Sequence, residues 1–314
     1  MNAFPKVNIL LSTFNGMDFL GEQLNSLQAQ DYPNIFIYIR DDGSTDGTVA
    51  FLQTYQKQFS NVDLILGENI GYKRSFFELT LIAGTNKEEF YAFCDQDDIW
   101  SPQKISRAVN FLQKSSDPHL GLYFSRLTFV DSNLRSLGLS PNPRYLDFGN
   151  ALVECNPCGC TMVFGSKIRD LYVQGKPYDK FSHDGWVNLV ATAFGHIVYD
   201  AEPQIQFREH PANTSIGHKL KTDPVFRLKF RVKDLLQRLF QNNPIVDFLI
   251  QAEAFLKTYP DMPTNQRLLI EELFHLRKPN TQRQRLSYIF NSKVHFNDPL
   301  EDLVLKLMIV LGQH

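Results

Sequence analysis

The sequence lacks any long apolar segment and carries almost no net charge. No stretch of its 314 residues approaches the roughly 18 uninterrupted apolar residues that a membrane-spanning helix needs. Lysine and arginine together number 32 and aspartate and glutamate 34, so a formal net charge of -2 provides no field that would attract nucleic acid. No apolar signal segment precedes the first apolar run at residue 7. We therefore expect a cytoplasmic protein with no nucleic-acid partner.

Cysteine is scarce as well, since the chain has only Cys94, Cys155, Cys158 and Cys160. The last three form a C-x-x-C-x-C segment, but a structural zinc site usually needs four ligands, and no second C-x-x-C or H-x-x-H pair is present. We interpret them as small residues that pack a tight turn and strand in a reducing compartment. The sequence also contains no Walker A, G-x-S-x-G or H-E-x-x-H motif, which argues against the enzyme classes that carry these motifs.

Two acidic clusters are the most informative features present, because each directly follows an apolar run. The first, after residues 35–39, consists of Asp41 and Asp42. The second, after residues 90–94, consists of Asp95, Asp97 and Asp98. Crowded carboxylates repel one another and lose solvation at a strand end, so a fold tolerates them chiefly where a cation or a hydrogen-bond donor of a ligand offsets the charge. This pattern indicates a metal-assisted ligand site.

The second cluster allows a more specific prediction. Asp95 and Asp97 are two residues apart, and an extended backbone would place both carboxylates on the same side, where they could share one cation. Oxygen ligands favour Mg²⁺ or Mn²⁺ over zinc, and Mg²⁺ is typically held by one or two carboxylates together with substrate phosphates. We therefore expect Mn²⁺ or Mg²⁺ bound with a diphosphate. The alternative for such a cluster standing alone is a solvated acidic turn.

The first part of the chain alternates between strand and helix patterns. Strands are predicted at residues 7–12, 35–40, 62–66 and 90–94, and helices at 19–30, 45–59, 74–83 and 102–114. This alternation predicts a mainly parallel sheet whose ligand site lies at the carboxyl ends of the strands. Further strand patterns occupy 120–130 and 159–164, and helices are predicted at 185–194, 224–240, 244–259, 264–276 and from Asp298 onward.

Polar segments at the predicted strand ends occur in an order that resembles a known family. They are residues 12–16, 41–46, 69–71 with Arg74, 95–100, 159–164, 183–184 and 207–213. Over about residues 6–217 the chain is similar to the family 2 glycosyltransferases, a large inverting family, and within it to bacterial rhamnosyltransferase-like members. The resemblance implies an α/β GT-A fold, the Rossmann-like mixed sheet of nucleotide-diphospho-sugar transferases, with a catalytic domain over residues 1–217. The helix patterns after residue 217 lie outside the resemblance, and they predict a helical C-terminal extension over residues 218–314.

The resemblance assigns donor-binding roles to residues at the matching positions, which are Thr13, Asn15, Asp41, Asp42, Arg74, Asp95 and Asp97. Thr13 and Asn15 would line the nucleotide pocket, and Arg74, or Lys73 instead, would lie near the phosphates. An acid of the first cluster would contact the pyrimidine base and ribose, because an ionised carboxylate accepts the imide N–H of uracil or thymine. In the second cluster one or two carboxylates would hold the metal, and the predicted metal ligands are Asp97, Asp98 and His210.

Two further positions carry alternatives. Asp184 matches the catalytic aspartate of the family and would act as the general base, although an aspartate at a helix start can also be only an N-cap. The residue before it is His183, where the family more often has Glu. His210 would contact the metal or the diphosphate, or it is a structural histidine.

The activity implied is metal-dependent, inverting transfer of a sugar, with rhamnose favoured, from a nucleoside-diphosphate sugar to a hydroxyl of a bacterial cell-surface glycan precursor. The donor would be dTDP-rhamnose or a UDP-sugar, and the acceptor a glycan or lipid-linked glycan. One alternative is a nucleotidylyltransferase, but the first loop is not the basic, Gly-rich phosphate loop of such enzymes. Another is a non-enzymatic cation-binding module, since Asp42-x-Ser44-x-Asp46-Gly47 imitates an EF-hand, yet Gln53 stands where the loop requires Glu.

Basic and apolar residues alternate over residues 219–240 in the predicted C-terminal region. Lysines and arginines beside an apolar helix face are attracted to anionic lipid at roughly 1 kcal/mol per charge. This segment therefore predicts a peripheral contact at the inner face of the cell membrane. The alternative is an ordinary amphipathic helix that packs on the catalytic domain or forms a homo-oligomer contact.

Overall fold

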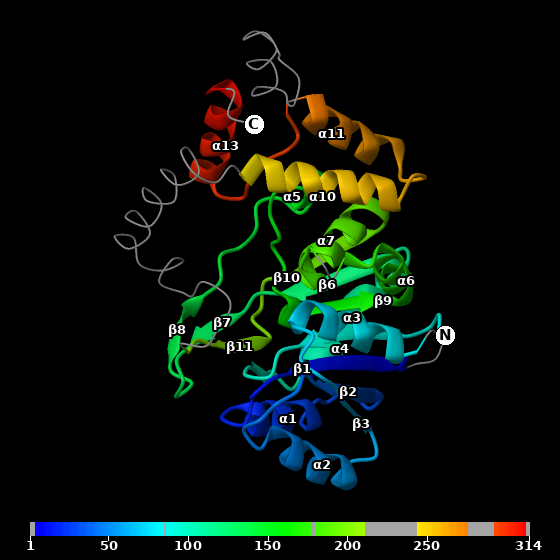
Figure 1. Cartoon of the computed structure of the whole chain (residues 1–314), viewed down its shortest axis with the longest axis vertical. Coiled ribbons are helices and arrows are strands. Elements are labelled where there is room, and N and C mark those ends of the chain that lie inside the picture. The colour runs from blue at the N-terminus through cyan, green and yellow to red at the C-terminus, as the bar shows by residue number, and fades with distance from the viewer. Residues whose placement is uncertain (1–3, 85, 178–179, 211–243, 276–291, 312–314) are drawn as a thin grey trace. The chain divides into compact units, whose positions relative to one another are not determined.

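The computed structural model describes residues 4–84, 86–177, 180–210, 244–275 and 292–311 (Figure 1). These residues fall into two compact units. The first contains residues up to Asn142, Pro157–Ala191 and the described residues of Gly195–Ser215. The second contains Pro143–Asn156, Thr192–Phe194 and the described residues from 244 to 311. The predicted helix at 224–240, the basic segment and the end of the 207–213 motif lie outside the described residues.

The first unit is built on a seven-stranded sheet in the order β10-β6-β9-β4-β1-β2-β3. The strands are β1 (Val7–Thr13), β2 (Ile35–Asp41), β3 (Val62–Leu66), β4 (Phe90–Cys94), β6 (Gly121–Ser125), β9 (Met162–Gly165) and β10 (His196–Asp200). Strands β3, β2, β1 and β4 run parallel, and β9 is antiparallel to both of its neighbours. The α/β expectation is confirmed, and the parallel order places the ends of β1, β2 and β4 at one edge of the sheet.

Helices cover both faces of this sheet. They are α1 (Leu20–Gln28), α2 (Thr48–Gln58), α3 (Tyr72–Ile82), α4 (Lys104–Gln113), α6 (Ser166–Gly175) and α7 (His183–Phe194), which enters the second unit at its end. Alternate β1 residues such as Ile9 and Leu11 join a buried core with residues of α1, α2 and α4. On the other face, aromatic residues of α3 and α6 contact the sheet and each other, as Phe76 of α3 does with Phe93 of β4. Figure 1 shows α3 opposite α1 and α2 across the sheet.

A second, four-stranded sheet in the order β5-β11-β7-β8 adjoins the end of β4 in the chain. It consists of β5 (Ile99–Trp100), β7 (Thr128–Val130), β8 (Ser136–Leu139) and β11 (Ile205–Arg208). Sequence periodicity did not predict β5, β8, β10 or β11, because strands of two to five residues have too few positions to show an alternation. The helix α6 was also not predicted. This small sheet matters for function, since β5 and β11 flank the second acidic cluster.

The second unit is mainly helical, with α5 (Phe148–Ala151), α10 (Pro244–Thr258), α11 (Thr264–His275) and α13 (Pro299–Leu311). Asp298 accepts from the backbone N–H of Leu300 at 2.9 Å, which confirms the predicted N-cap. The side chain of Asn297 donates to Asn156 at 2.6 Å and to Glu154 at 3.0 Å, so it ties the start of α13 to the segment around α5. None of the described helices is long and apolar enough to cross a bilayer. The division at residue 217 stays a prediction.

Candidate active site

The loops that follow β1 and β2 are joined by hydrogen bonds between polar side chains of one loop and backbone N–H groups of the other. Asn15 has φ of 49°, accepts the backbone N–H of Thr45 at 2.8 Å and donates its own N–H to Ser44 at 2.8 Å. Asp46 accepts the N–H of Met17 at 3.1 Å and the hydroxyl of Thr48 at 2.6 Å. These bonds hold the two predicted nucleotide-binding loops against one another. Asn15 remains exposed, as a pocket-lining residue must be.

Asp41 and Asp42 are both buried but have different surroundings. Asp42 forms an ion pair with Arg40 and accepts the backbone N–H groups of Ile70 at 2.9 Å and Gly71 at 2.8 Å. One oxygen of Asp41 accepts two N–H groups of its own turn, at 2.9 and 3.1 Å, while its Oδ2 has no hydrogen-bond partner among the described residues. Asp42 therefore shapes the loop before α3, and Asp41 keeps a buried oxygen without a hydrogen-bond partner among the described residues.

Gly43 makes the approach of these loops possible. Its φ is +84°, and a Cβ atom there would lie only 3.0 Å from the backbone nitrogen of Asn69. A side chain would be strained by the backbone conformation and crowded by a peptide group that cannot move away. The short Asp-Gly-Ser turn thus brings the segment 69–71, part of the family resemblance, against the end of β2.

Gln96 links the first group of loops to the second acidic cluster. Its Oε1 accepts the hydroxyl of Thr13 at 2.6 Å and the backbone N–H of Phe14 at 2.9 Å, and its Nε2 donates to the carbonyl of Phe14 at 3.3 Å. Thr13 is thus buried against the acidic loop. The predicted nucleotide-side and metal-side residues therefore belong to one site, as the parallel strand order requires.

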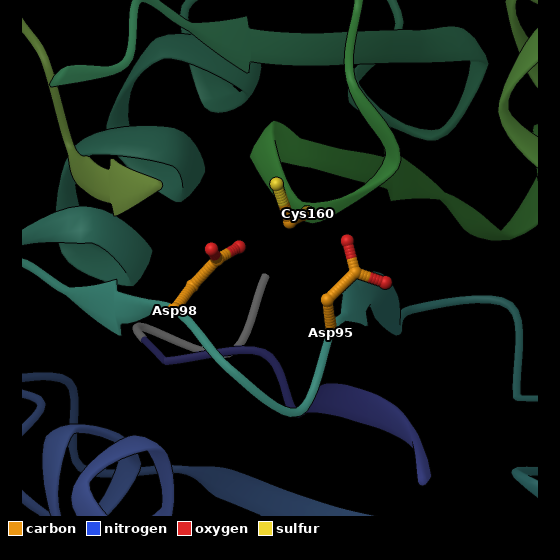
Figure 2. A group of neighbouring side chains, drawn as sticks. All are labelled: Asp95, Asp98 and Cys160. Atoms are coloured by element: carbon orange, nitrogen blue, oxygen red, sulfur yellow. The ribbon is translucent and has the colours of Figure 1, made fainter. Parts of the chain in front are cut away.

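The backbone of the second cluster is bent, in contrast to the extended conformation we expected. Strand β4 ends at Cys94, bends occupy Gln96 and Asp97, and β5 begins at Ile99. Among the described residues, the close group formed here consists of Asp95, Asp98 and Cys160, whose ligand atoms lie within 4.8 Å of one another (Figure 2). The assumption of an extended backbone was therefore wrong, because bends replace the pleat at Gln96 and Asp97. That Asp95 and Asp97 share one cation stays a prediction.

Asp97 instead contacts His210, with its Oδ2 2.9 Å from Nε2 of the imidazole. Arg208 fixes the position of the acidic loop through two hydrogen bonds. Its backbone N–H donates to Asp98 at 3.1 Å, and its Nε donates to the carbonyl of Asp97 at 2.9 Å. The guanidinium also stacks over Phe19 at 4.6 Å and forms an ion pair with Glu22. Strand β11 thus brings His210 to the acidic loop although 113 residues separate it from Asp97.

Charge and burial strongly perturb this loop. Burial, together with the carboxylates of Asp97 and Asp184, raises the pKa of Asp95 to about 7. Burial also raises the pKa of Asp98 well above its usual value, and its Oδ2 is buried with no hydrogen-bond partner in the described part of the chain. A cation would relieve the repulsion and supply the missing partner, so the donor set fits a divalent ion.

Lys104, the first residue of α4, lies behind the loop. Its side chain is fully buried and its ammonium group lies 3.4 Å from the ring centre of Trp100. Burial lowers its pKa to about 7, although neighbouring acidic groups, which include Cys160 and Asp98, oppose the shift. The ammonium group of Lys104 therefore loses its proton easily near neutral pH, and it does not fully offset the charge of the acidic loop.

Asp184 lies at the start of α7, where the N-cap is a different residue. Ser182 provides the cap, and its hydroxyl accepts the N–H of Gly185 at 3.2 Å. Asp184 is therefore not the N-cap residue, although its Oδ1 also accepts the N–H of Gly185 at 2.8 Å. The carboxylate is partly exposed, and its role as the base stays a prediction. Its charge raises the pKa of Asp95, which places the candidate base beside the acidic loop.

His183 is buried, whereas its neighbour in the sequence is not. Its ring stacks on Phe76 at 4.2 Å and meets Phe93 edge-on at 4.7 Å, and neither ring nitrogen has a partner among the described residues. Burial lowers the pKa of His183, so the ring packs as a neutral aromatic group. We assign His183 to the support of the base and not to the chemistry.

The first turn of α3 brings an exposed aromatic and two basic residues to the same region. Burial and the charges of Asp184 and Asp95 raise the pKa of Tyr72, and its ring meets His183 edge-on at 6.1 Å. Lys73 donates to the carbonyl of Lys180 at 3.3 Å. Arg74 is half exposed and lies 3.7 Å from Glu78, so its role at the phosphates stays a prediction.

Sequence reasoning missed four residues of the site: Gln96, Arg208, Tyr72 and Cys160. Gln96 stood inside the acidic motif but carries no charge, and Arg208 preceded the predicted His210. The aromatic residue directly after the Asn-Ile-Gly turn was a usable signal for Tyr72. Cys160 was considered only together with other cysteines and not with the carboxylates that it approaches.

Comparison with known proteins agrees with this geometry. Residues 8–169 match the family described as Glycosyl transferase family 2. An uncharacterized glycosyltransferase of Rickettsia typhi is 27% identical over 220 residues, which cover 67% of this chain and 66% of that relative. A dTDP-rhamnosyl transferase of Shigella flexneri is 25% identical over 72% of this chain and 82% of the relative. The chain thus spans about two thirds of the length of the Rickettsia protein.

A solved structure shows the same fold at lower identity. A mannosyltransferase from Pyrobaculum calidifontis, in complex with GDP-Man and Mn²⁺, has a TM-score of 0.50 and 17% identity, and the match covers 99% of this chain and 86% of that one. The family match includes more than half of the chain and contains β1, the first acidic cluster and the second acidic cluster. The chain therefore belongs to glycosyl transferase family 2.

Proposed function

We propose that this protein transfers a sugar from a nucleoside-diphosphate sugar to an acceptor hydroxyl with inversion at the anomeric carbon, in a reaction that requires Mn²⁺ or Mg²⁺. The observation that carries the proposal is the placement of Asp184 beside the acidic loop, which joins a candidate base to a candidate diphosphate site in one fold. Each part alone is common in proteins. Their combination at the carboxyl ends of β1, β2 and β4 is what a transferase needs.

Donor binding is divided between the two halves of the site. Asp41, whose Oδ2 has no partner among the described residues, would accept the imide N–H of the base, and Thr13 and Asn15 would line the pocket. Arg74, or Lys73, would contact the phosphates. Asp97, Asp98 and His210 would hold the divalent ion, with Asp95 as a further acidic neighbour.

The chemistry follows from the charges that develop in the reaction. The sugar leaves the diphosphate with oxocarbenium character, and the acceptor hydroxyl attacks from the opposite face. A bound divalent ion would stabilise the departing diphosphate as a Lewis acid. Asp184 would accept the proton of the attacking hydroxyl, and such a positioned base typically contributes about 10²–10⁴-fold. A single displacement of this kind inverts the anomeric configuration.

For the donor we propose dTDP-rhamnose first and UDP-sugars second. Support comes from the rhamnosyltransferase-like motif set and from the 25% identity to the Shigella rhamnosyl transferase. The acceptor would be a glycan or lipid-linked glycan of the bacterial surface, reached from the cytoplasm. The basic segment at 219–240 would suit a peripheral contact with anionic lipid or a contact between copies of the chain.

The test is release of nucleoside diphosphate from a panel of dTDP-rhamnose, UDP-glucose, UDP-N-acetylglucosamine and GDP-mannose, with Mn²⁺ and with EDTA. We expect Mn²⁺-dependent release of nucleoside diphosphate from one class of donor. In the presence of the true acceptor, the Asp184→Asn variant should lose this release. The Ser182→Ala variant is the matched control, because it weakens the same helix start without touching the base. A protein that releases no nucleoside diphosphate from any donor, but releases pyrophosphate from a nucleoside triphosphate and a sugar 1-phosphate, would be a nucleotidylyltransferase and contradict the proposal.

A further inference from the structure

The group formed by Asp95, Asp98 and Cys160 differs from an ordinary acidic metal site because one of its ligands is a thiol. Figure 2 shows the three side chains near one another, with Asp95 and Asp98 on one loop and Cys160 on another segment of the chain. Their ligand atoms lie within 4.8 Å of one another. Thiolates favour zinc and other soft ions, whereas carboxylates alone favour Mg²⁺ and Mn²⁺.

A second thiol lies next to the first. The sulfur atoms of Cys158 and Cys160 are 3.6 Å apart, and the thiol of Cys160 donates to that of Cys158. Two zinc–sulfur bonds of about 2.3 Å at a tetrahedral angle would separate the sulfurs by about 3.8 Å. The two thiols therefore already have almost the separation that a tetrahedral ion requires. Cys158 lies outside the group whose ligand atoms are all within 4.8 Å of one another, so its thiol would have to turn toward the carboxylates to complete a set of four ligands.

The group also contains an unsatisfied buried acceptor. Asp98 is fully buried, and its Oδ2 has no hydrogen-bond partner among the described residues, although its other oxygen accepts the N–H of Arg208. Such an atom loses its hydration without compensation. Coordination of a cation would supply the missing partner.

We propose that Asp95, Asp98 and Cys160 form a site for a thiophilic divalent ion, Zn²⁺, that Cys158 becomes the fourth ligand when its thiol turns toward the carboxylates, and that an ion bound there inhibits the transferase. The inhibition rests on the proposed function, since Asp95 and Asp98 also belong to the proposed donor-binding loop. A tetrahedral ion held by both carboxylates would withdraw them from the ion that accompanies the diphosphate. Zinc and the donor would therefore compete.

This site explains why the cysteine segment did not look like a zinc site in the sequence. That analysis asked for a second pair of cysteines or histidines, and the chain has none. The remaining ligands are carboxylates that lie about 60 residues earlier in the chain and reach Cys160 only because β4 and the turn before β9 are neighbours. Mn²⁺ held by Asp97, Asp98 and His210 would have no thiol ligand, which gives the two sites different metal preferences.

Binding is tested on the full chain with Co²⁺ as a spectroscopic probe for Zn²⁺, in the presence of a non-thiol reductant. We expect a thiolate-to-cobalt charge-transfer band that Zn²⁺ abolishes. The band should be lost in Cys160→Ser and retained in Cys155→Ser, which removes an exposed thiol of the same segment. Cys158→Ser, which changes a half-exposed residue, should weaken Co²⁺ binding by about 10–100-fold and serves if Cys160→Ser fails to fold. Absence of the band in the wild-type protein, or its persistence in a folded Cys160→Ser variant, overturns the proposal.

Inhibition is tested separately by titrating Zn²⁺ into the Mn²⁺-dependent reaction. The wild-type and Cys155→Ser proteins should be inhibited alike, and Cys160→Ser should need at least about tenfold more Zn²⁺. If no charge-transfer band forms but Mn²⁺-dependent nucleotide release persists, this inference fails and the proposed function stands. If the band forms in a protein that releases no nucleoside diphosphate from any donor, the zinc site is supported and the proposed function fails.

Discussion

The two acidic clusters follow strands of the same sheet, yet the fold treats them in opposite ways. Asp42 of the first cluster is neutralised inside the protein by Arg40 and two backbone N–H groups. In the second cluster, Asp98 is buried and Asp95 partly buried near other carboxylates, and Asp98 keeps an acceptor without a partner in the described chain. The first cluster is mainly a structural device that shapes a loop. The second leaves a buried acceptor without a partner among the described residues, and we propose that a cation completes it.

This contrast means that removing a carboxylate should destabilise the protein at the first cluster and stabilise the metal-free protein at the second. It also separates residues that support the loops from residues that act on substrate. Each of the following substitutions tests one side of the comparison.

The largest effect is expected for Asp184→Asn, which should lower the turnover rate by about 10²–10⁴-fold. Donor binding should be retained, because the amide keeps the shape of the side chain and Asp184 is not a predicted donor ligand. Turnover with donor and acceptor is compared with calorimetric binding of the nucleoside diphosphate. Near-normal transfer by this variant would remove Asp184 from the mechanism.

Asp42→Ala should lower the free energy of unfolding by about 3–5 kcal/mol, because it leaves the buried guanidinium of Arg40 without its partner. It also frees two backbone N–H groups of the loop before α3. Urea unfolding in EDTA measures the change. A loss below 1 kcal/mol would mean that the first cluster is not the structural device described here.

Asp97→Asn should weaken Mn²⁺-dependent nucleotide binding by roughly 10–100-fold, and His210→Ala should do the same if the imidazole is a ligand. Because both side chains would act on one ion, the double variant should lose little more than either single variant. Calorimetry with UDP or dTDP, with and without Mn²⁺, measures these affinities. Full additivity would show that His210 acts independently of Asp97, as a structural histidine does.

The smallest effect is expected for Asp98→Asn in the absence of metal. Burial raises the pKa of Asp98, so above about pH 4 this group lowers the free energy of unfolding. A neutral amide removes this destabilisation, and its oxygen can still accept the N–H of Arg208. We expect a gain of about 1 kcal/mol in EDTA, larger at pH 8 than at pH 5. Thermal unfolding at the two pH values checks this, and a loss of stability at both would contradict the comparison.

Much of the site could be predicted from the sequence because it lies in loops that follow periodic strands. The strand predictions at 62–66 and 90–94 match β3 and β4, and Asp95 directly follows β4. A short, strongly apolar run followed by carboxylates is local information. For the same reason the α/β fold and the position of Asp184 at a helix start were predictable, although its cap, Ser182, was not identified.

The chain order and composition thus determined which residues stand at the carboxyl ends of the strands, since parallel strand order depends mainly on periodicity and connection length. Only the tertiary structure decided how each carboxylate is used. Arg40 neutralises Asp42, the bend at Gln96 and Asp97 turns Asp95 towards Asp98, and β11 brings His210 to Asp97. The charge state and ligand set of a carboxylate depend on burial and on partners far along the chain, and neither is present in a local pattern.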